Sequence, residues 1–216
     1  MYNLSYFKEE DKNVVLQFMK QHPFAFITGC DENNKPVATQ IPVFIDERNG
    51  GLFLSGHIMK NTDHHKAFLH NPNVLAVFTG AQTYVSAGVY DNPNQASTWN
   101  YMSVHAKGIL SFLDHEALLH ILKRTTDHFD GNDPHSPSSF DNLPTAYVEH
   151  LSKAIIAFEI EVKEIDNVFK LSQNRNEKSY HNIIESLHER RDPQSETIAT
   201  EMEKRIEQMN TKWHKD

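Results

Sequence analysis

Hydrophobic and polar residues alternate along several short stretches of this chain, which is the pattern of half-buried β-strands. Residues 154–165 show it most clearly: the even positions from Ile156 to Val162 are hydrophobic, and the odd positions from Glu159 to Lys163 are charged. Such alternation packs one face of an antiparallel strand on the core and leaves the other face in water. Five further strands are predicted over residues 24–29, 36–46, 52–56, 74–79 and 98–112, and residues 84–90 are a candidate continuation of the sheet.

Turn and capping residues divide these strands from helices. Asn49-Gly50-Gly51 marks a tight turn because Asn and Gly tolerate positive φ, so the second and third strands should form a hairpin. Asn61 or Thr62 can cap one helix, Asp114 can cap another, and Asp192-Pro193 should split the polar tail into two helices. The predicted helices cover residues 8–21, 62–70, 114–129, 147–152 and the tail after residue 175.

Six strand signals joined mostly by hairpins or single short helices favour a barrel over a sheet of βαβ units. The predicted fold is mainly β with flanking helices: a six-stranded antiparallel split β-barrel with C-terminal helices. We expect one barrel domain with its N-terminal helix over residues 1–175, and a helical extension packed on the same domain over residues 176–216. A barrel this small leaves little interior room, so a large ligand is expected outside it, in a groove or at a subunit junction.

Composition narrows the class of protein. Of the 216 residues, 38% are hydrophobic and 23% are charged, which excludes a disordered chain. The net charge of −8 and the lack of a helix-turn-helix or basic stripe argue against tight DNA binding by the isolated protein. One lone cysteine, Cys30, fits a reducing compartment, and we see neither a signal peptide nor a hydrophobic run near the roughly 18 residues of a membrane span. A cytoplasmic location is therefore expected.

A first candidate site lies in residues 55–66, where a strand passes into a helix. Backbone N–H groups at the helix start, together with His57, Lys60 and Lys66, can hold an anion such as a phosphate. Asp63 opposes this interpretation, because its carboxylate competes for the same positive helix end. The alternative is a solvated helix face with surface histidines.

A second candidate site lies near the start of the strand over residues 98–112. Trp99 and Tyr101 could cover an aromatic ligand ring, while Thr98, Asn100 and His105 could bond to its polar edge. The alternative is core packing, because aromatic residues on a strand commonly pack in the core.

A third cluster, residues 170–175, gathers donors and acceptors in one short loop after a strand. Its alternative is a polar entry to a helix, with Ser172 or Asn174 as the cap. The fourteen histidines include His64-His65, but no spaced Cys/His signature and no His-Glu-x-x-His occurs. We therefore expect no metal site, and no residue is assigned a catalytic role.

Three strings carry a resemblance over nearly the whole chain. They are Gly56-His57 with Lys60-Asn61, Thr98-Trp99-Asn100-Tyr101 with Val104-His105, and Lys170-Leu171-Ser172-Gln173-Asn174-Arg175. With Met1-Tyr2 and Phe7 at the start, these strings resemble the PaiB-type FMN-binding negative transcriptional regulators. The resemblance implies an FMN-binding split barrel, usually a homodimer with the flavin at the subunit junction, and a role in repressing transcription.

The resemblance also implies a set of cofactor-binding residues. By likeness to related split-barrel flavoproteins, the residues that take the FMN phosphate are His57, Lys60, Asn61 and Lys66. Those that approach the flavin, from the same chain or its partner, are Thr98, Trp99, Asn100 and His105. The third string adds Lys170, Gln173 and Asn174.

The chain departs from the family pattern at two places. The family commonly has arginine where Lys60 stands, and a Ser-Pro-Ser-Trp-Tyr string where this chain has Ser86-Ala87-Gly88-Val89-Tyr90. Two other functions stay open, because a fold alone does not fix function. One is an FMN-dependent oxidoreductase of the pyridoxamine-phosphate-oxidase-like split-barrel class, and the other is a flavin-free binding module, for example for haem.

Overall fold

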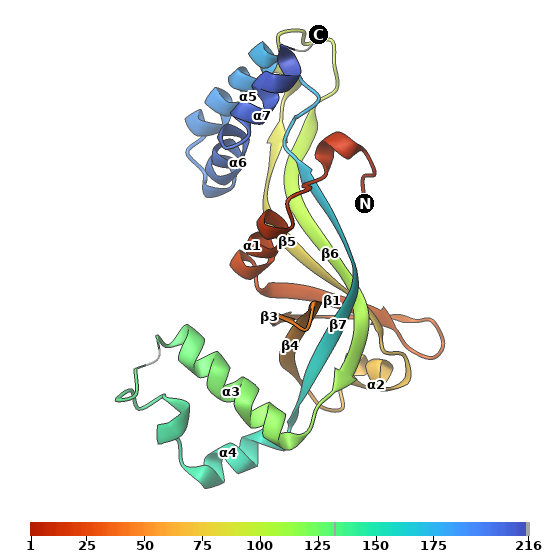
Figure 1. Ribbon diagram of the computed structural model, residues 1–216, viewed down its shortest axis with the longest axis vertical. Coiled ribbons are helices and arrows are strands. Elements are labelled where there is room, and N and C mark those ends of the chain that lie inside the picture. Colours follow the sequence, from red (N-terminus) through yellow and green to blue (C-terminus); the bar gives the residue numbers. More distant parts are fainter. Residues whose placement is uncertain (132, 215–216) are drawn as a thin grey trace. The chain divides into compact units, whose positions relative to one another are not determined.

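The computed structural model describes residues 1–131 and 133–214 (Figure 1). Unit 1 comprises Met1–Phe18, Thr79–Val104 and Asp166–Asp216, and unit 2 comprises Met19–Phe78 and His105–Ile165. Neither unit has a limit at residue 175, and the two domains expected from the sequence stay a prediction. The strands are β1 (Phe24–Cys30), β2 (Pro36–Pro42), β3 (Phe44–Arg48), β4 (Gly51–Met59), β5 (Asn73–Val85), β6 (Thr98–Phe112) and β7 (Ile155–Lys170). The α-helices are α1 (Lys12–Gln21), α2 (Asp63–His70), α3 (His115–Phe129), α4 (Thr145–Ser152), α5 (Glu177–Glu189), α6 (Pro193–Glu203) and α7 (Ile206–Trp213).

Unit 2 contains the barrel, to which the strands β1 to β7 all contribute. The strand order in the sheet is β2-β1-β5-β6-β7-β4-β3, so β2 and β3 are its two edges. In the sequence, however, only Val43 separates these edge strands. A sheet whose two edges are joined by one residue must curl back on itself, and β2 and β4 do contact each other. The predicted split-barrel class, with an antiparallel sheet and C-terminal helices, is confirmed.

The structure has seven strands where six were predicted, because residues 36–46 form two strands instead of one. Pro42 ends β2, and proline has no backbone N–H for a further ladder bond. The buried Val43 donates its own N–H to the carbonyl of Pro23 at 2.9 Å. The chain thus leaves one edge of the sheet at Pro42 and enters the other at Phe44.

The barrel core follows the predicted alternation, and it brings two backbones unusually close together. Phe158 and Ile160 of β7 are fully buried, whereas Glu161 and Lys163 are exposed. On Gly108 of β6, a Cβ would lie 2.5 Å from the carbonyl oxygen of Glu161 and 2.6 Å from Cγ2 of Ile160. Only glycine fits between β6 and β7 at this point.

Unit 1 contains the C-terminal helices, of which α6 and α7 both pack on α5 (blue in Figure 1). Asp192 caps α6 by accepting the N–H groups of Gln194 and Ser195, and Pro193 is the first helical residue, so the predicted break is confirmed. Tyr180 of α5 is fully buried and donates its hydroxyl to the carbonyl of Met202 at 3.0 Å. Burial raises the pKa of Tyr180, which keeps the phenol protonated. None of the helices that the structure describes is long and apolar enough to cross a membrane.

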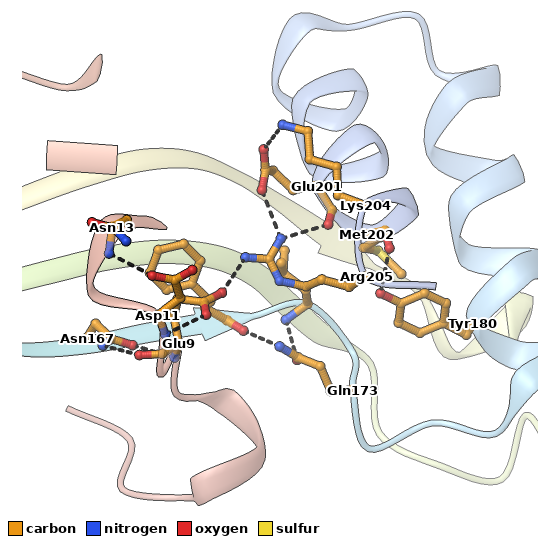
Figure 2. Close-up of polar contacts among 12 residues, drawn as sticks. Glu9, Asp11, Asn13, Asn167, Gln173, Tyr180, Glu201, Met202, Lys204 and Arg205 are labelled. Atoms are coloured by element: carbon orange, nitrogen blue, oxygen red, sulfur yellow. Dashed lines mark hydrogen bonds and ion pairs between the residues drawn. The ribbon is translucent and has the colours of Figure 1, made fainter. Parts of the chain in front are cut away.

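A buried arginine joins three segments of unit 1 (Figure 2). Arg205, which is 8% exposed, donates from Nη1 to the Glu201 carboxylate at 2.9 Å and from Nη2 to Glu9 at 3.0 Å. The backbone N–H and carbonyl of Glu9 are bonded in turn by the side chain of Asn167 at 2.8 and 3.0 Å. The guanidinium also lies over the ring of Phe169, 5.4 Å from its centroid. One cation therefore holds the N-terminal segment, the end of β7 and the C-terminal helices together.

Candidate functional site

The predicted site residues fall into both units, and each group is described by itself. Those in unit 2 are His57, Lys60, Asn61, Lys66 and His105. Those in unit 1 are Thr98, Trp99, Asn100, Lys170, Gln173 and Asn174.

The turn from β4 to α2 gathers several cationic groups around one imidazole. Asn61 adopts φ of 65° and donates its N–H to Nδ1 of His65 at 3.2 Å, so this ring nitrogen carries no proton. The pKa of His65 is lowered first by burial and then by the positive charges of His64, Lys60 and Lys66. The charges of Lys60 and Lys66 thus both act on His65, and an anion site at this turn stays a prediction.

The start of α2 is partly occupied by its own side chains. Thr62 is the cap, accepting the N–H of His65, which confirms one of the two predicted caps. Asp63 is solvent-exposed. Its carboxylate accepts hydrogen bonds from the backbone N–H of His64 at 2.8 Å and from Nδ1 of the His64 ring at 3.1 Å. These bonds hold the pKa of Asp63 below its usual range, so its carboxylate opposes a second anion there. Lys60 is half-buried, while Asn61 and Lys66 are exposed.

His57 lies on β4 itself, because β4 extends to Met59 where the predicted strand ended at residue 56. It lines a pocket of about 80 Å³ together with residues of α3, and neither Lys60 nor Lys66 belongs to that lining. Burial lowers the pKa of His57, so its ring is neutral near pH 7. His105, on β6, is also half-buried.

In unit 1, several predicted ligand residues bond to one another. Asn100 is 0% exposed; its Oδ1 accepts the hydroxyl of Ser172 at 3.0 Å and its Nδ2 donates to the sulfur of Met202 at 3.5 Å. Gln173 is also buried, and its side chain accepts the N–H of Leu171 at 2.8 Å. These amides hold the loop after β7, in which Ser172 has φ of 63°. Their role toward a flavin stays a prediction.

Other residues of this cluster remain accessible. Trp99 is 53% exposed and meets exposed Tyr84 edge-on, with ring centroids 5.9 Å apart. Lys170 donates to the hydroxyl of Thr98, and its pKa is lowered by burial and then by the charge of Arg175. Asn174 is exposed. Trp99 is therefore an exposed aromatic side chain, and Lys170 is a half-buried cation bonded to its neighbour in the sequence, Thr98.

Sequence reasoning missed the other walls of the His57 pocket. Lys20, Thr125 and His128 line it with His57, yet they come from α1 and α3. Because Lys20 lies about 100 residues before Thr125 and His128, no short sequence motif could predict that these residues line one pocket. Within the described ranges 1–131 and 133–214, no group of three or more His, Cys, Asp or Glu could hold a metal ion.

Comparison with known proteins gives a family and a fold. Residues 1–164 match the family described as "Putative FMN-binding domain". Protease synthase and sporulation protein PAI 2 of Bacillus subtilis (strain 168) is 30% identical over 95% of this chain and 98% of its own length.

Solved structures share the fold at low sequence identity. A conserved hypothetical protein, Rv2991 from Mycobacterium tuberculosis, is 10% identical with a TM-score of 0.55, covering 79% of this chain and 91% of that one. The flavocytochrome Anf3 from Azotobacter vinelandii is 18% identical with a TM-score of 0.54, and the match covers 78% of this chain and 72% of that one. These similarities concern the split-barrel fold alone.

Proposed function

Because this chain belongs to the FMN-binding domain family matched over residues 1–164, we propose that it binds FMN on the outside of its barrel. The observation that carries the proposal is the positive-φ turn at Asn61 between β4 and α2, which has Lys60 immediately before it and the exposed Lys66 in the first half of α2. When bound, the flavin would supply one- or two-electron redox chemistry, and the residues of this chain would hold and orient it.

Lys60, Asn61 and Lys66 are proposed to take the phosphate, with His57 beside them on β4. Two lysine charges near a positive-φ turn suit a dianion, and lysine binds phosphate as a point charge. Asp63 at the helix start makes the lysines more important, because the helix end alone is partly neutralised.

Trp99 is proposed to cover the flavin ring, since it is the exposed aromatic residue of the Thr-Trp-Asn-Tyr string. By the family resemblance, Thr98, Lys170 and Asn174 of unit 1 and His105 of unit 2 are proposed as polar neighbours of the ring, from the same chain or from its partner in a dimer. Asn100 and Gln173 are proposed to hold the loop after β7 in position for the flavin, because both amides are buried and bonded inside unit 1.

The protein is proposed to act as a regulator, as its family resemblance implies. The net charge of −8 opposes close approach to a phosphate backbone. We therefore propose that the isolated protein does not bind DNA tightly and that any effect on transcription needs another component.

A homodimer is expected, because the pocket that His57 lines is too small to enclose a flavin. The pocket beside His57 has a volume of about 80 Å³, whereas pockets that enclose drug-sized ligands measure roughly 300–1,000 Å³. A second copy related by a two-fold axis would supply the missing wall twice. Light scattering should therefore give the mass of two chains. A monomer that binds FMN at full affinity would contradict this expectation.

Replacing Lys60 with alanine is expected to weaken FMN binding by about 10- to 100-fold, the equivalent of one charge-assisted hydrogen bond. Riboflavin lacks the phosphate, so its affinity should hardly change. Calorimetry with both ligands on the wild type and on Lys60→Ala measures the four affinities.

Lys35→Ala is the matched control, because Lys35 is an exposed lysine in the turn between β1 and β2. This variant should bind both ligands as the wild type does. Equal losses of FMN and riboflavin affinity in Lys60→Ala would mean that Lys60 is structural. No loss of either would remove Lys60 from the phosphate site.

A further inference from the structure

A small pocket is lined by residues from the C-terminal half of α3, from β3 and β4, and from the segments next to them. Its apolar walls come from two prolines and a valine near the barrel edges, from Phe44 and Ile45, and from Phe129 of α3. Its polar groups are Lys20, His57, Thr125 and His128. The family resemblance singled out only His57 among these.

Specific contacts between α3 and β3 hold the pocket walls in place. Arg124 of α3 makes a two-pronged ion pair with Asp46 of β3, at 2.7 and 2.8 Å. Its guanidinium lies over the ring of Phe44, 4.0 Å from the centroid, and that ring meets His128 edge-on at 5.7 Å. At the other end of the helix, Leu118 and Ile121 are buried in a cluster with Ala157 of β7. The pocket is therefore formed by packed side chains from fixed elements.

The charges in the pocket favour an anion, although the protein as a whole is acidic. Among the described residues of the lining, Lys20 is the one side chain that is positively charged at neutral pH whatever the state of the histidines. The described lining contains no carboxylate. Glu47 outside the lining lies 3.6 Å from the Lys20 ammonium, but both side chains are largely exposed, so this pair contributes little. Asp46 is already paired with Arg124.

The polar groups, the volume and the apolar walls of the pocket limit the charge and size of the anion. Burial lowers the pKa of His57, so at neutral pH it offers a hydrogen bond without a charge. One lysine cannot compensate a dianion that is moved out of water, whereas a monoanion is balanced. A volume of about 80 Å³ excludes nucleotides and fits a few heavy atoms. The apolar walls require a hydrocarbon group on the ligand.

We propose that this pocket binds a short-chain carboxylic acid as its monoanion. Lys20 holds the carboxylate, Thr125 and the two histidines offer hydrogen bonds to it, and Phe44 and Phe129 contact the hydrocarbon end. The proposal goes beyond flavin binding, because the lysines proposed for the phosphate lie outside this lining. The pocket would give the protein a second small ligand.

Calorimetry or ligand-observed NMR with isobutyrate tests the proposal on the full chain. Isobutyrate should bind, while the neutral isobutyramide and inorganic phosphate should bind at least about 10-fold more weakly. Lys20→Met should weaken isobutyrate binding by about 10- to 100-fold, and Glu47→Gln should tighten it by freeing Lys20. Lys12→Met, on the same helix but outside the lining, should leave it unchanged.

A second pair of variants tests the wall formed by α3. His128→Gln should weaken isobutyrate binding, whereas His120→Gln should not, because His120 lies on α3 outside this lining. Equal binding of isobutyrate and isobutyramide, preference for phosphate, or wild-type binding by Lys20→Met would overturn the proposal.

The two proposals fail separately. FMN affinity measured on the same variants should be unchanged in Lys20→Met and lowered in Lys60→Ala, while isobutyrate affinity should show the reverse. Loss of both ligands in both variants would overturn the assignment of two separate anion sites.

Discussion

Replacing Arg205 with methionine is expected to lower the free energy of unfolding of unit 1 by about 3 kcal/mol. This value is the lower end of the usual effect of removing one partner from a buried ion pair. The substitution leaves Glu9 partly buried without its cation, and Glu201 keeps only the pair with the exposed Lys204. Urea unfolding followed by tryptophan fluorescence measures the effect. The signal reports on unit 1, because both tryptophans of the chain, Trp99 and Trp213, belong to it.

Lys204→Met is the matched control, since Lys204 pairs with the same Glu201 but its side chain is 62% exposed. Exposed pairs contribute less than about 1 kcal/mol, so this variant should unfold almost like the wild type. Replacing Arg205, Glu9 and Glu201 together with methionine should be less harmful than Arg205→Met alone, because no uncompensated carboxylate remains. A single variant as stable as Lys204→Met would show that the buried network contributes little.

Replacing Gly108 with alanine is expected to destabilise the barrel by about 3 kcal/mol, the upper part of the usual range for overpacking. The added Cβ would lie 2.5 Å from the carbonyl oxygen of Glu161. That oxygen belongs to the backbone of β7, and Glu161 is paired in register with Phe53 of β4. The clash cannot be relieved by rotating a side chain, so β6 and β7 must separate. Urea unfolding followed by far-UV circular dichroism should detect the loss.

Gly88→Ala is the control for the general effect of adding a methyl group to glycine. The nearest atom to its new Cβ is the hydroxyl oxygen of Ser86 at 3.4 Å, and the residue lies in a short 3₁₀ turn. Its stability should stay within about 0.5 kcal/mol of the wild type, as for most surface substitutions. A Gly108→Ala protein that unfolds at the same urea concentration as Gly88→Ala would contradict the close approach of the two strands.

Local patterns predicted the elements of this fold where the deciding residues are neighbours in the sequence. The alternation around Phe158 gave a strand, and Asp192-Pro193 gave a helix break, because period and capping act within a few residues. Val43 was not recognised as a junction, because its N–H bonds to Pro23, which is far from it in the sequence. A pattern of side chains does not record such a long-range bond.

The same limit applies to the residues of the candidate site. Lys60 and Lys66 were expected together because both lie near one helix start, and in the structure the charges of both lower the pKa of His65, whereas their role toward a phosphate stays a prediction. Asn100 was expected to be a ligand from its place in a string, and this role stays a prediction; its full burial was not foreseen, because it depends on Met202 and Ser172, which lie far along the chain. Polar residue types mark a site only when the fold leaves them accessible, and accessibility is a property of the tertiary structure.

The strand order of the curled sheet, with β4 paired to both β3 and β7, also sets an order of events during synthesis on the ribosome. Hairpins β1–β2 and β3–β4 can form early, since their partners are adjacent in the sequence. The second partner of β4 is β7, so one side of β4 stays unpaired until residues 155–162 emerge. Until then the nascent chain exposes a sheet edge carrying Leu52, Leu54 and Ile58, the kind of surface that recruits other strands or a chaperone. Translation of residues 60–154, which contain α2, β5, β6, α3 and α4, therefore sets how long this edge remains open.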